Sequence, residues 1–164
     1  MISIQDLHIT FNTNTPLENP VLKGLHLDIP KGQFITVIGS NGAGKSTLLN
    51  ALSGEVTAQK GKIFLDKQEI STWPVHKRAP HIARVFQDPL TGTCESLTIE
   101  ENLALAYARV KKRSFSRAAK KAYHQKFKSK LKTLGLGLEK RLDDKIGLLS
   151  GGQRQAVSLL MAAL

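Results

Sequence analysis

Residues 39–47, which read GSNGAGKST, constrain this chain more than any other stretch. They match the phosphate-binding loop pattern of a glycine, four variable residues, a second glycine, a lysine and a serine or threonine. The residues at the fixed positions are Gly39, Gly44, Lys45 and Ser46. Residues 34–38, before the loop, are apolar and β-branched, which predicts a buried parallel strand. Residues 46–52, after it, predict a helix that ends at Gly54, so the motif has the flanking strand and helix that a chance glycine-rich turn would lack.

The residue types of this loop suit a bound phosphate. Glycine permits the unusual backbone dihedrals that point successive N–H groups at an anion, and the helix N-terminus adds its dipole and unpaired donors. Lys45 should reach the outer phosphates of a nucleotide, and the Ser46 hydroxyl should bind Mg²⁺. The expected nucleotide contacts are Gly39, Ser40, Asn41, Gly42, Ala43, Gly44, Lys45, Ser46 and Thr47.

Alternating apolar residues predict two strands ahead of the loop, one at Ile2–Phe11 and one at residues 21–29. Because each strand has one buried face, the pattern favours an antiparallel sheet beside the parallel core. Residues 61–70 predict a further strand of this antiparallel sheet, and residues 82–86 predict another strand of the parallel core.

Capping signals predict the helices of the second half of the chain. Thr98 begins a Thr-x-x-Glu pattern with the spacing of a capping box, so a helix should start there and end near residue 110. A second helix is expected over residues 116–134. Ser150 is expected to cap a last helix at residues 153–164.

The composition is that of a globular cytosolic chain, with 41% hydrophobic residues and one cysteine. No apolar run is long enough to cross a bilayer, and the first residues lack the basic and then apolar layout of a signal peptide. A single cysteine, Cys94, excludes an internal disulfide, and we interpret it as an incidental small residue.

The net charge of +11 has a marked local source. From Arg109 to Lys132 there is no acidic residue. The basic residues between these two are Lys111, Lys112, Arg113, Arg117, Lys120, Lys121, Lys126, Lys128 and Lys130. Such a run can bind nucleic acid or a membrane surface, or it can be a solvated helix face whose balancing acids lie elsewhere. We favour the solvated face, because the run is not interleaved with base-stacking aromatic residues in a repeated way.

A second motif brings in a known family. Residues 149–153 read LSGGQ, which is similar to the signature sequence of the ATP-binding cassette (ABC) ATPases. The order of motifs also resembles this family: a Walker A motif at residues 39–47, a glutamine, Gln87, at the position of the Q-loop, and then the signature. Phe11 stands where the family has an aromatic residue that stacks on adenine, although tyrosine is commoner there.

The resemblance implies roles for particular residues. Phe11 would stack on the adenine of ATP; the less favoured alternative for this residue taken alone is a core phenylalanine. Lys45 and Gln87 would take part in catalysis, with Gln87 contacting Mg²⁺ and the attacking water. The signature would contact the γ-phosphate held by a second subunit, so that two ATP molecules lie between two head-to-tail chains. The signature residues with this role are Ser150, Gly151, Gly152 and Gln153.

The family also implies a fold and a division into parts. The expected fold is an α/β P-loop NTPase core with an antiparallel β subdomain, an α-helical subdomain and a truncated parallel sheet. Residues 1–96 would form the nucleotide-binding core, residues 97–148 the helical subdomain that docks on a membrane partner, and residues 149–164 the signature motif and its helix.

The family's next motif, Walker B, is four apolar residues followed by Asp-Glu, and it does not occur before Leu164. Residues 63–66 imitate it, but they precede the signature and are followed by Lys67. We therefore expect an N-terminal part of such an ATPase, with an open edge to its parallel sheet. We also expect negligible ATP hydrolysis by this chain alone, because the residues that orient Mg²⁺ and water would be missing.

The function that the resemblance favours is the ATP-binding subunit of an ABC transporter, at the cytoplasmic side of the cell membrane, with a membrane-spanning permease as partner. The main alternative is a soluble ABC ATPase that acts on nucleic acid or ribosomes, with the basic run as its contact surface. A third possibility is a non-catalytic, ATP-binding regulatory fragment. The transported solute and the direction of transport do not follow from the sequence.

Overall fold

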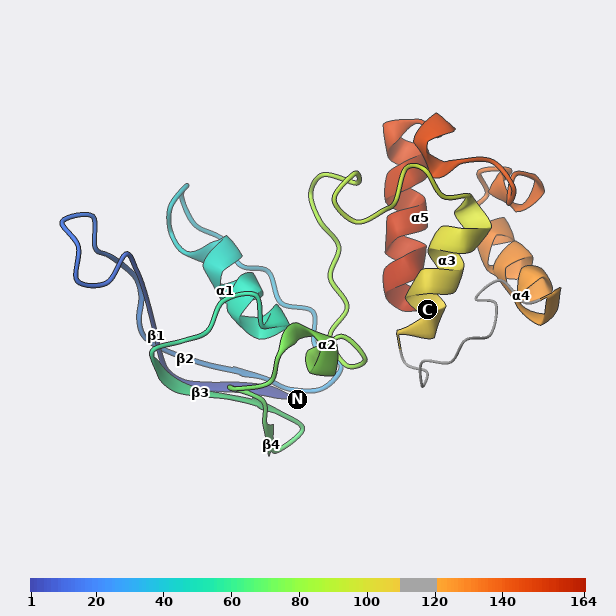
Figure 1. Ribbon diagram of the computed structural model, residues 1–164. Helices are drawn as coiled ribbons and strands as arrows, with labels where there is room; N and C mark the ends of the chain where they lie inside the picture. The colour runs from blue at the N-terminus through green and yellow to red at the C-terminus, as the bar shows by residue number, and fades with distance from the viewer. Residues whose placement is uncertain (110–120) are drawn as a thin grey trace. The chain divides into compact units, whose positions relative to one another are not determined.

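The computed structural model describes residues 1–109 and 121–164, which divide into two compact units (Figure 1). The first unit is Met1–Ile82 and the second is Ala83–Leu164. The expected end of one helix at residue 110 and the expected start of the next at residue 116 lie outside the described residues.

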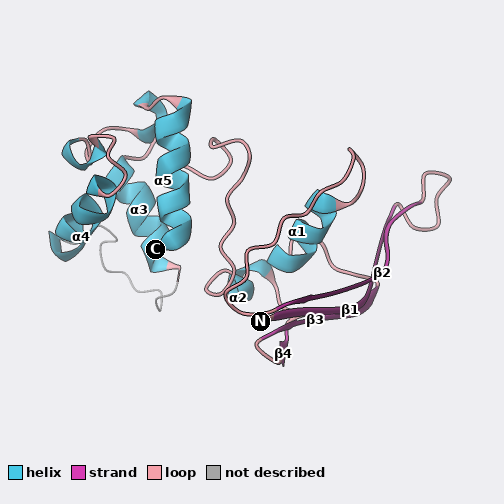
Figure 2. Cartoon of the chain, turned by 180° about the vertical axis from the view of Figure 1, so that it is seen from behind, coloured by secondary structure: helices cyan, strands magenta, loops and turns pink. Residues whose placement is uncertain are grey.

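The first unit is built on an antiparallel sheet with the strand order β2-β1-β3-β4, drawn in magenta in Figure 2. The strands are β1 (Ile2–Phe11), β2 (Asn19–Ile29), β3 (Lys60–Leu65) and β4 (Gln68–Glu69). The antiparallel pairing of the first two strands confirms the prediction from alternation. The single strand expected over residues 61–70 is instead a hairpin, because Asp66 and Lys67 adopt left-handed backbone conformations that reverse the chain.

The core of this unit lies between the sheet and helix α1 (Lys45–Ser53). In β1, Ile4, Leu7 and Ile9 are fully buried, with an irregularity in the strand pairing between Ile4 and Leu7. Leu48 and Ala51 supply the apolar side of α1. Gly54, in the left-handed conformation, ends α1 as predicted. The helix is therefore anchored to the sheet by a few apolar contacts that fix the position of its first turn.

A buried arginine forms hydrogen bonds at the C-terminal end of α1. Arg78, in the short helix α2 (Val75–Arg78), is only 2% exposed, and burial lowers the pKa of its guanidinium. It donates to the carbonyl oxygens of Ala51 at 2.6 Å and Leu52 at 3.0 Å, at the C-terminal end of α1. It also donates to the carbonyls of Trp73 and Ser71. A cation at this helix end satisfies carbonyls that have no partner within the helix.

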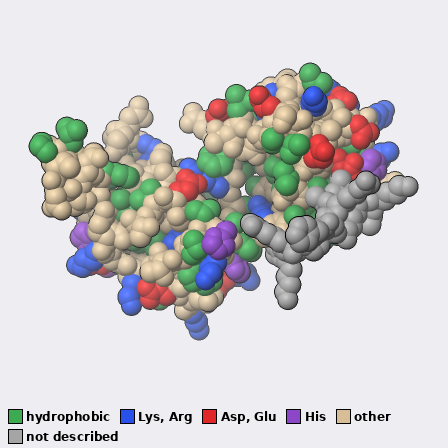
Figure 3. Space-filling model, viewed as in Figure 1, with side chains coloured by type: hydrophobic (Ala, Val, Ile, Leu, Met, Phe, Trp, Pro, Cys, Tyr) green, Lys and Arg blue, Asp and Glu red, His purple; other side chains and the backbone are tan. Residues whose placement is uncertain are grey.

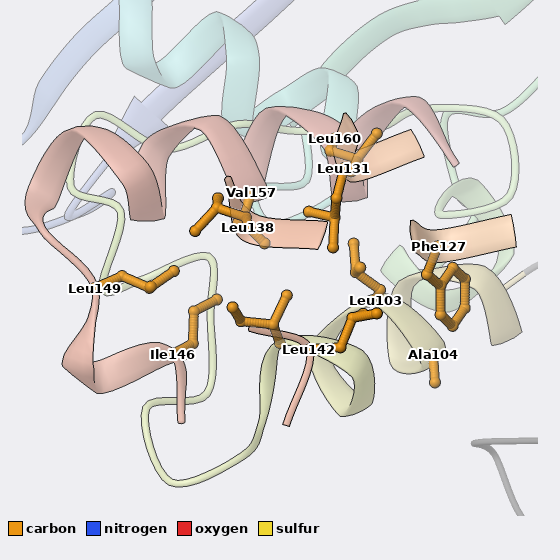
Figure 4. Packing of buried hydrophobic residues seen from close by; sticks show 11 residues of the cluster. Leu103, Ala104, Phe127, Leu131, Leu138, Leu142, Ile146, Leu149, Val157 and Leu160 are labelled. Carbon is orange, nitrogen blue, oxygen red and sulfur yellow. The ribbon is translucent and has the colours of Figure 1, made fainter. Parts of the chain in front are cut away.

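The second unit is helical. Its helices are α3 (Ile99–Ala108), α4 (Lys121–Lys132) and α5 (Gly151–Ala163), with the 3₁₀ turns η1 (Leu138–Lys140) and η2 (Ile146–Leu148). Their apolar faces meet in one core, in which Leu103, Phe127, Leu138, Ile146 and Val157 are fully buried (Figure 4). Complete capping boxes confirm Thr98 and Ser150 as the N-caps of α3 and α5, although α5 begins two residues earlier than residue 153, where it was expected.

Two sequence predictions about the parallel core are wrong. Residues 34–38 and residues 82–86 form no strand. Phe34 is 94% exposed and Ile38 is 89% exposed, so the apolar run before the loop is not buried. A strand needs a neighbour to satisfy its backbone N–H and C=O groups, and no described residue pairs with either segment. The sheet that the described residues form is wholly antiparallel.

Basic and acidic side chains are interspersed over the visible face of the molecule (Figure 3). The sequence distributes them unevenly, because residues 83–164 hold 16 of the 24 Lys and Arg residues and seven of the 13 Asp and Glu residues. Within the described residues, no helix has the length and apolar character needed to span a bilayer.

Candidate nucleotide-binding site

The glycine-rich loop enters α1 through a conformation that needs glycine. Gly44 precedes the first residue of α1 with φ 86° and ψ 6°, in the left-handed region. A Cβ at this position would lie 3.0 Å from Val21 Cγ1 and 3.1 Å from Leu22 Cδ2 of β2. Gly42 has the same φ, 86°, but a Cβ there would meet no atom within 4 Å. Gly44 is therefore required by both its dihedrals and its contact with the sheet.

The Lys45 side chain forms hydrogen bonds with the backbone of this loop. Its Nζ donates to the carbonyl oxygen of Gly39 at 2.7 Å and to that of Ser40 at 2.8 Å. A Cβ on Gly39 would lie 3.0 Å from the Cβ of Ala43, so the start of the loop approaches this residue closely. The backbone thus curls around an ammonium group, and this arrangement suits the oxygens of a phosphate, which would bind the same cation.

The electrostatics at the start of α1 favour an anion. No acidic residue lies in the first turn of the helix, where Ser46 is exposed and Thr47 is half-buried. The first N–H groups of a helix carry partial positive charge, and Lys45 adds a full one. The loop residues, with Lys45 and Ser46, therefore fit a magnesium nucleotide: amides and a cation for the phosphates, and a free hydroxyl for the metal.

Phe11 lies at the end of β1, on the same part of the sheet as the loop. It pairs with Asn19 of β2, two and three residues before the Val21 and Leu22 that contact Gly44. Phe11 is 38% exposed and does not belong to the buried core, which removes the interpretation as a core phenylalanine. Its ring is thus available to a ligand on the edge of the first unit.

The signature residues stand at an exposed helix N-terminus in the second unit. The Ser150 Oγ accepts from the Gln153 N–H at 3.3 Å, and the Gln153 Oε1 accepts from the Ser150 N–H at 3.3 Å. Gly151 and Gly152 are exposed, and a Cβ on either would meet no atom within 4 Å. The start of α5 can therefore approach another molecule closely with its amides and the Ser150 hydroxyl.

Gln87 is exposed and belongs to the second unit. Phe86 beside it accepts a long hydrogen bond of 3.5 Å from Gln155 Nε2 of α5, and the Arg84 guanidinium lies 4.5 Å from the Phe86 ring centroid. The structure thus brings Gln87 and the signature helix together in one unit. It places Phe11 and the phosphate-binding loop together in the other.

Sequence reasoning missed the residues that join the segment after Gln87 to α5. Arg154, 8% exposed, donates to Glu95 Oε1 at 2.8 Å and to the Gly147 carbonyl at 3.0 Å. A Cβ on Gly92 would lie 2.9 Å from Ser158 Oγ. A signal was present, because residue 154 falls on the same helical face as the apolar Val157, and a charge on such a face requires a partner.

The fold and this loop define the class of protein. The first unit has a glycine-rich loop that curls around a lysine at a helix N-terminus and an antiparallel sheet, and the same chain has a helical unit. This combination is that of a P-loop nucleotide-binding cassette. The family model described as "ABC transporter" matches residues 22–164 of the chain. The chain belongs to the ABC transporter family.

Individual relatives agree. The tyrosine transport ATP-binding protein of Clostridioides difficile (strain R20291) is 40% identical over 164 residues, which is 100% of this chain and 65% of that protein. The solved dimeric structure of a bacterial ABC transporter cassette has a TM-score of 0.80 at 26% identity and covers 99% of this chain and 68% of that chain. A dimeric ATP-binding cassette in a post-hydrolysis state has a TM-score of 0.81 at 24% identity, again over 99% of this chain and 68% of that one. The chain thus spans about two thirds of these relatives.

Proposed function

We propose that this chain is the ATP-binding part of an ABC transporter subunit that couples the binding and hydrolysis of ATP to solute transport. The observation that carries the proposal is the loop of residues 39–47, whose carbonyls surround the Lys45 ammonium at the N-terminus of α1. A phosphate chain would take over these contacts of Lys45 and would add hydrogen bonds from the loop amides.

The chemistry of the proposed activity is phosphoryl transfer from ATP to water with Mg²⁺, which neutralises charge on the phosphates when bound. Lys45 would hold the outer phosphates, and the Ser46 hydroxyl would supply one ligand of the metal. The Gln87 side chain would offer an amide oxygen to the metal and to the attacking water. Phe11 offers a ring face to the adenine.

The signature helix supports a dimer as the working form. Two relatives of known structure are named as dimeric cassettes, one of them bound to ADP and Pi. In a head-to-tail pair, the exposed start of α5, with the Ser150 hydroxyl and the amides of Gly151 and Gly152, would face the γ-phosphate on the other chain.

Transport is the proposed task because the curated relative at 40% identity is named a tyrosine transport ATP-binding protein. We extend this to a membrane-spanning permease as partner and to the cytoplasmic side of the cell membrane as location. The solute of that relative is not assigned to this chain. A permease encoded beside this chain and copurifying with it would support the assignment, and copurification with ribosomes instead would contradict it.

The soluble alternative, an ABC ATPase that acts on nucleic acid, receives less support. Binding of single strands without sequence preference uses exposed aromatic side chains on which bases stack. Among the described aromatic residues of α3 and α4, Phe127 is fully buried and Tyr107 and Tyr123 pack against the same core.

The adenine contact provides a sharp test of the site. The change Phe11→Ala should weaken ATP binding about five- to tenfold, because stacking contributes on the order of 1 kcal/mol, whereas Phe11→Tyr should bind like the parent. Leu17, also exposed near this edge, gives the matched control Leu17→Ala, which should leave the affinity unchanged. Fluorescence titration with ATP measures all four proteins. Parent-like binding by Phe11→Ala would remove Phe11 from the site.

A further inference from the structure

The outer side of α4 carries a set of lysines that nucleotide binding does not use. The helix is Lys121–Lys132, and α4 lies at the side of the helical unit in both views (Figures 1 and 2). Its apolar side packs into the core of the helical unit, where Phe127 and Leu131 are fully buried. Within residues 123–132 of α4, the exposed residues are Gln125, Lys126, Lys128, Ser129, Lys130 and Lys132. We call these six residues the α4 lysine face.

The helical repeat arranges these lysines in two rows. Lys128 and Lys132, four residues apart, lie on one side of the exposed face, and Lys126 and Lys130 lie on its other side. The neutral residues Gln125 and Ser129 lie between the rows. A flat surface that touches the helix at these two uncharged residues would be flanked by lysines on both sides, each with a long flexible side chain.

The charge of this face is not balanced by carboxylates on α4. The helix contains no Asp or Glu, and among the described residues no ion pair is formed by Lys128, Lys130 or Lys132. Lys126 lies 4.2 Å from the centroid of the Tyr107 ring. Glu100 of α3, an acid close to α4, is already bound by His124 at 3.1 Å. Like charges at this spacing repel one another, so a partner of opposite charge would stabilise the face.

We propose that the α4 lysine face binds the headgroups of an anionic phospholipid bilayer. All four cations are lysines, and none is arginine. Lysine is a mobile point charge, whereas arginine is the side chain that suits bidentate recognition of a fixed phosphate or carboxylate. The face has two rows of lysines with the neutral residues Gln125 and Ser129 between them. This arrangement suits the fluid, planar, anionic surface of a bilayer better than a binding site of fixed shape on a protein or nucleic acid. No aromatic side chain of the face is exposed for base stacking, because Tyr123 and Phe127 contribute to the core.

This inference depends on the charge of α4 and not on the proposed ATP-dependent transport. The sequence before α4 continues the same charge, since no acidic residue occurs from Arg109 to Lys132. The described lysines are sufficient for a test. Binding should weaken as salt rises, because the charges involved are exposed and are screened within a Debye length.

The experiment measures cosedimentation of the chain with vesicles of phosphatidylcholine alone and of phosphatidylcholine mixed with phosphatidylglycerol. The parent should bind only the mixed vesicles. The triple variant Lys128→Gln, Lys130→Gln, Lys132→Gln should lose on the order of a hundredfold in affinity, from about fivefold per lysine near an anionic surface. The matched control, Lys23→Gln, Lys31→Gln, Lys77→Gln, removes the same charge from exposed lysines of the first unit and should lose little. Circular dichroism establishes that both variants are folded.

Several results would overturn the proposal. These are equal retention of the parent on both vesicles, parent-like binding by the α4 variant, or an equal loss in the control variant, which would indicate net charge without a defined face. Tighter binding of the same three lysines to RNA or to polyglutamate than to vesicles would assign the face to another partner. Lys45→Ala should bind vesicles like the parent, so failure of this inference is separate from failure of nucleotide binding.

Discussion

Two glycines of the phosphate-binding loop share a backbone conformation but differ in their surroundings. Gly42 and Gly44 both have φ 86°, yet only Gly44 is packed against β2, through Val21 and Leu22. A side chain at either position is strained, because a left-handed residue with a Cβ costs roughly 1–2 kcal/mol. Only at Gly44 would the added Cβ also collide with side chains of β2. The pair therefore separates the conformational role of glycine from the close approach that fixes the loop on the sheet.

We predict that Gly44→Ala weakens both folding and ATP binding more than Gly42→Ala does. Alanine at position 44 would displace the loop from β2, whereas alanine at position 42 meets no neighbouring atom. We expect an unfolding free energy lower by about 1–2 kcal/mol for Gly42→Ala and a larger loss for Gly44→Ala. Urea unfolding and ATP titration measure the two effects. Equal losses would mean that contact with the sheet does not position the loop.

The second residue-scale prediction concerns acid stability. Lys60, which binds Asp6 Oδ2 at 2.8 Å, and His8, which is 2.8 Å from its Oδ1, lower the pKa of the Asp6 carboxyl from 3.8 to about 2. Because the pKa is lower in the folded state, this contribution to stability is complete above pH 3.8 and is lost as the pH falls toward 2.

The substitution Asp6→Asn should therefore flatten the dependence of the unfolding free energy on pH between about 4 and 2, as measured by urea unfolding. Lys60→Gln, which removes the larger cause of the shift, should flatten the same interval. A parent-like profile in both variants would show that this ion pair does not contribute to acid stability.

At the scale of the elements, the caps of α3 and α5 are alike in geometry but not in position. Thr98 and Ser150 each accept from the third residue of their helix, Glu101 and Gln153, in complete capping boxes. Hydrogen bonds from the Thr98 backbone and side chain lower the pKa of Glu101. Only the start of α5 has glycines, Gly151 and Gly152, that leave its amides open to another molecule.

We predict that Ser150→Ala and Thr98→Ala each lower the stability of the helical unit by about 1 kcal/mol, the usual value of an N-cap side chain. Ser150→Ala should in addition weaken ATP-dependent association of two chains, measured by sedimentation velocity, because it removes a hydroxyl from the proposed anion site. Thr98→Ala is the matched control. Equal effects of the two substitutions on association would leave Ser150 a structural cap only.

At the scale of the whole molecule, features that depend on nearby residues were predicted better than features that depend on residues far apart in the sequence. The antiparallel strands β1 and β2, the capping box at Thr98 and the N-cap at Ser150 were predicted correctly, because each depends on residues close together in the chain. The strand expected at residues 34–38 failed because a parallel strand depends on distant partners. The β3–β4 hairpin was missed because Asp66 and Lys67, and no glycine, adopt its positive φ angles.

The candidate site could be predicted in part for the same reason. The motif located the phosphate-binding loop and Lys45, but the contact of Gly44 with β2 depends on packing between segments far apart in the sequence. The pairing of Arg154 with Glu95, 59 residues away, is likewise a tertiary contact. The roles of Phe11, Gln87 and the signature residues remain predictions, since they concern a ligand and a second chain.

The measurement that tests the central claim most directly is equilibrium titration of the chain with Mg-ATP, with Lys45→Ala and Lys31→Ala compared with the parent. Lys45 lies inside the loop, whereas Lys31 is an exposed lysine in the turn after β2. Loss of the charged hydrogen bonds from Lys45 to phosphate, about 1.5–3 kcal/mol, should weaken binding roughly ten- to hundredfold, and Lys31→Ala should bind like the parent. If Lys45→Ala binds ATP as tightly as the parent, residues 39–47 are not the nucleotide site.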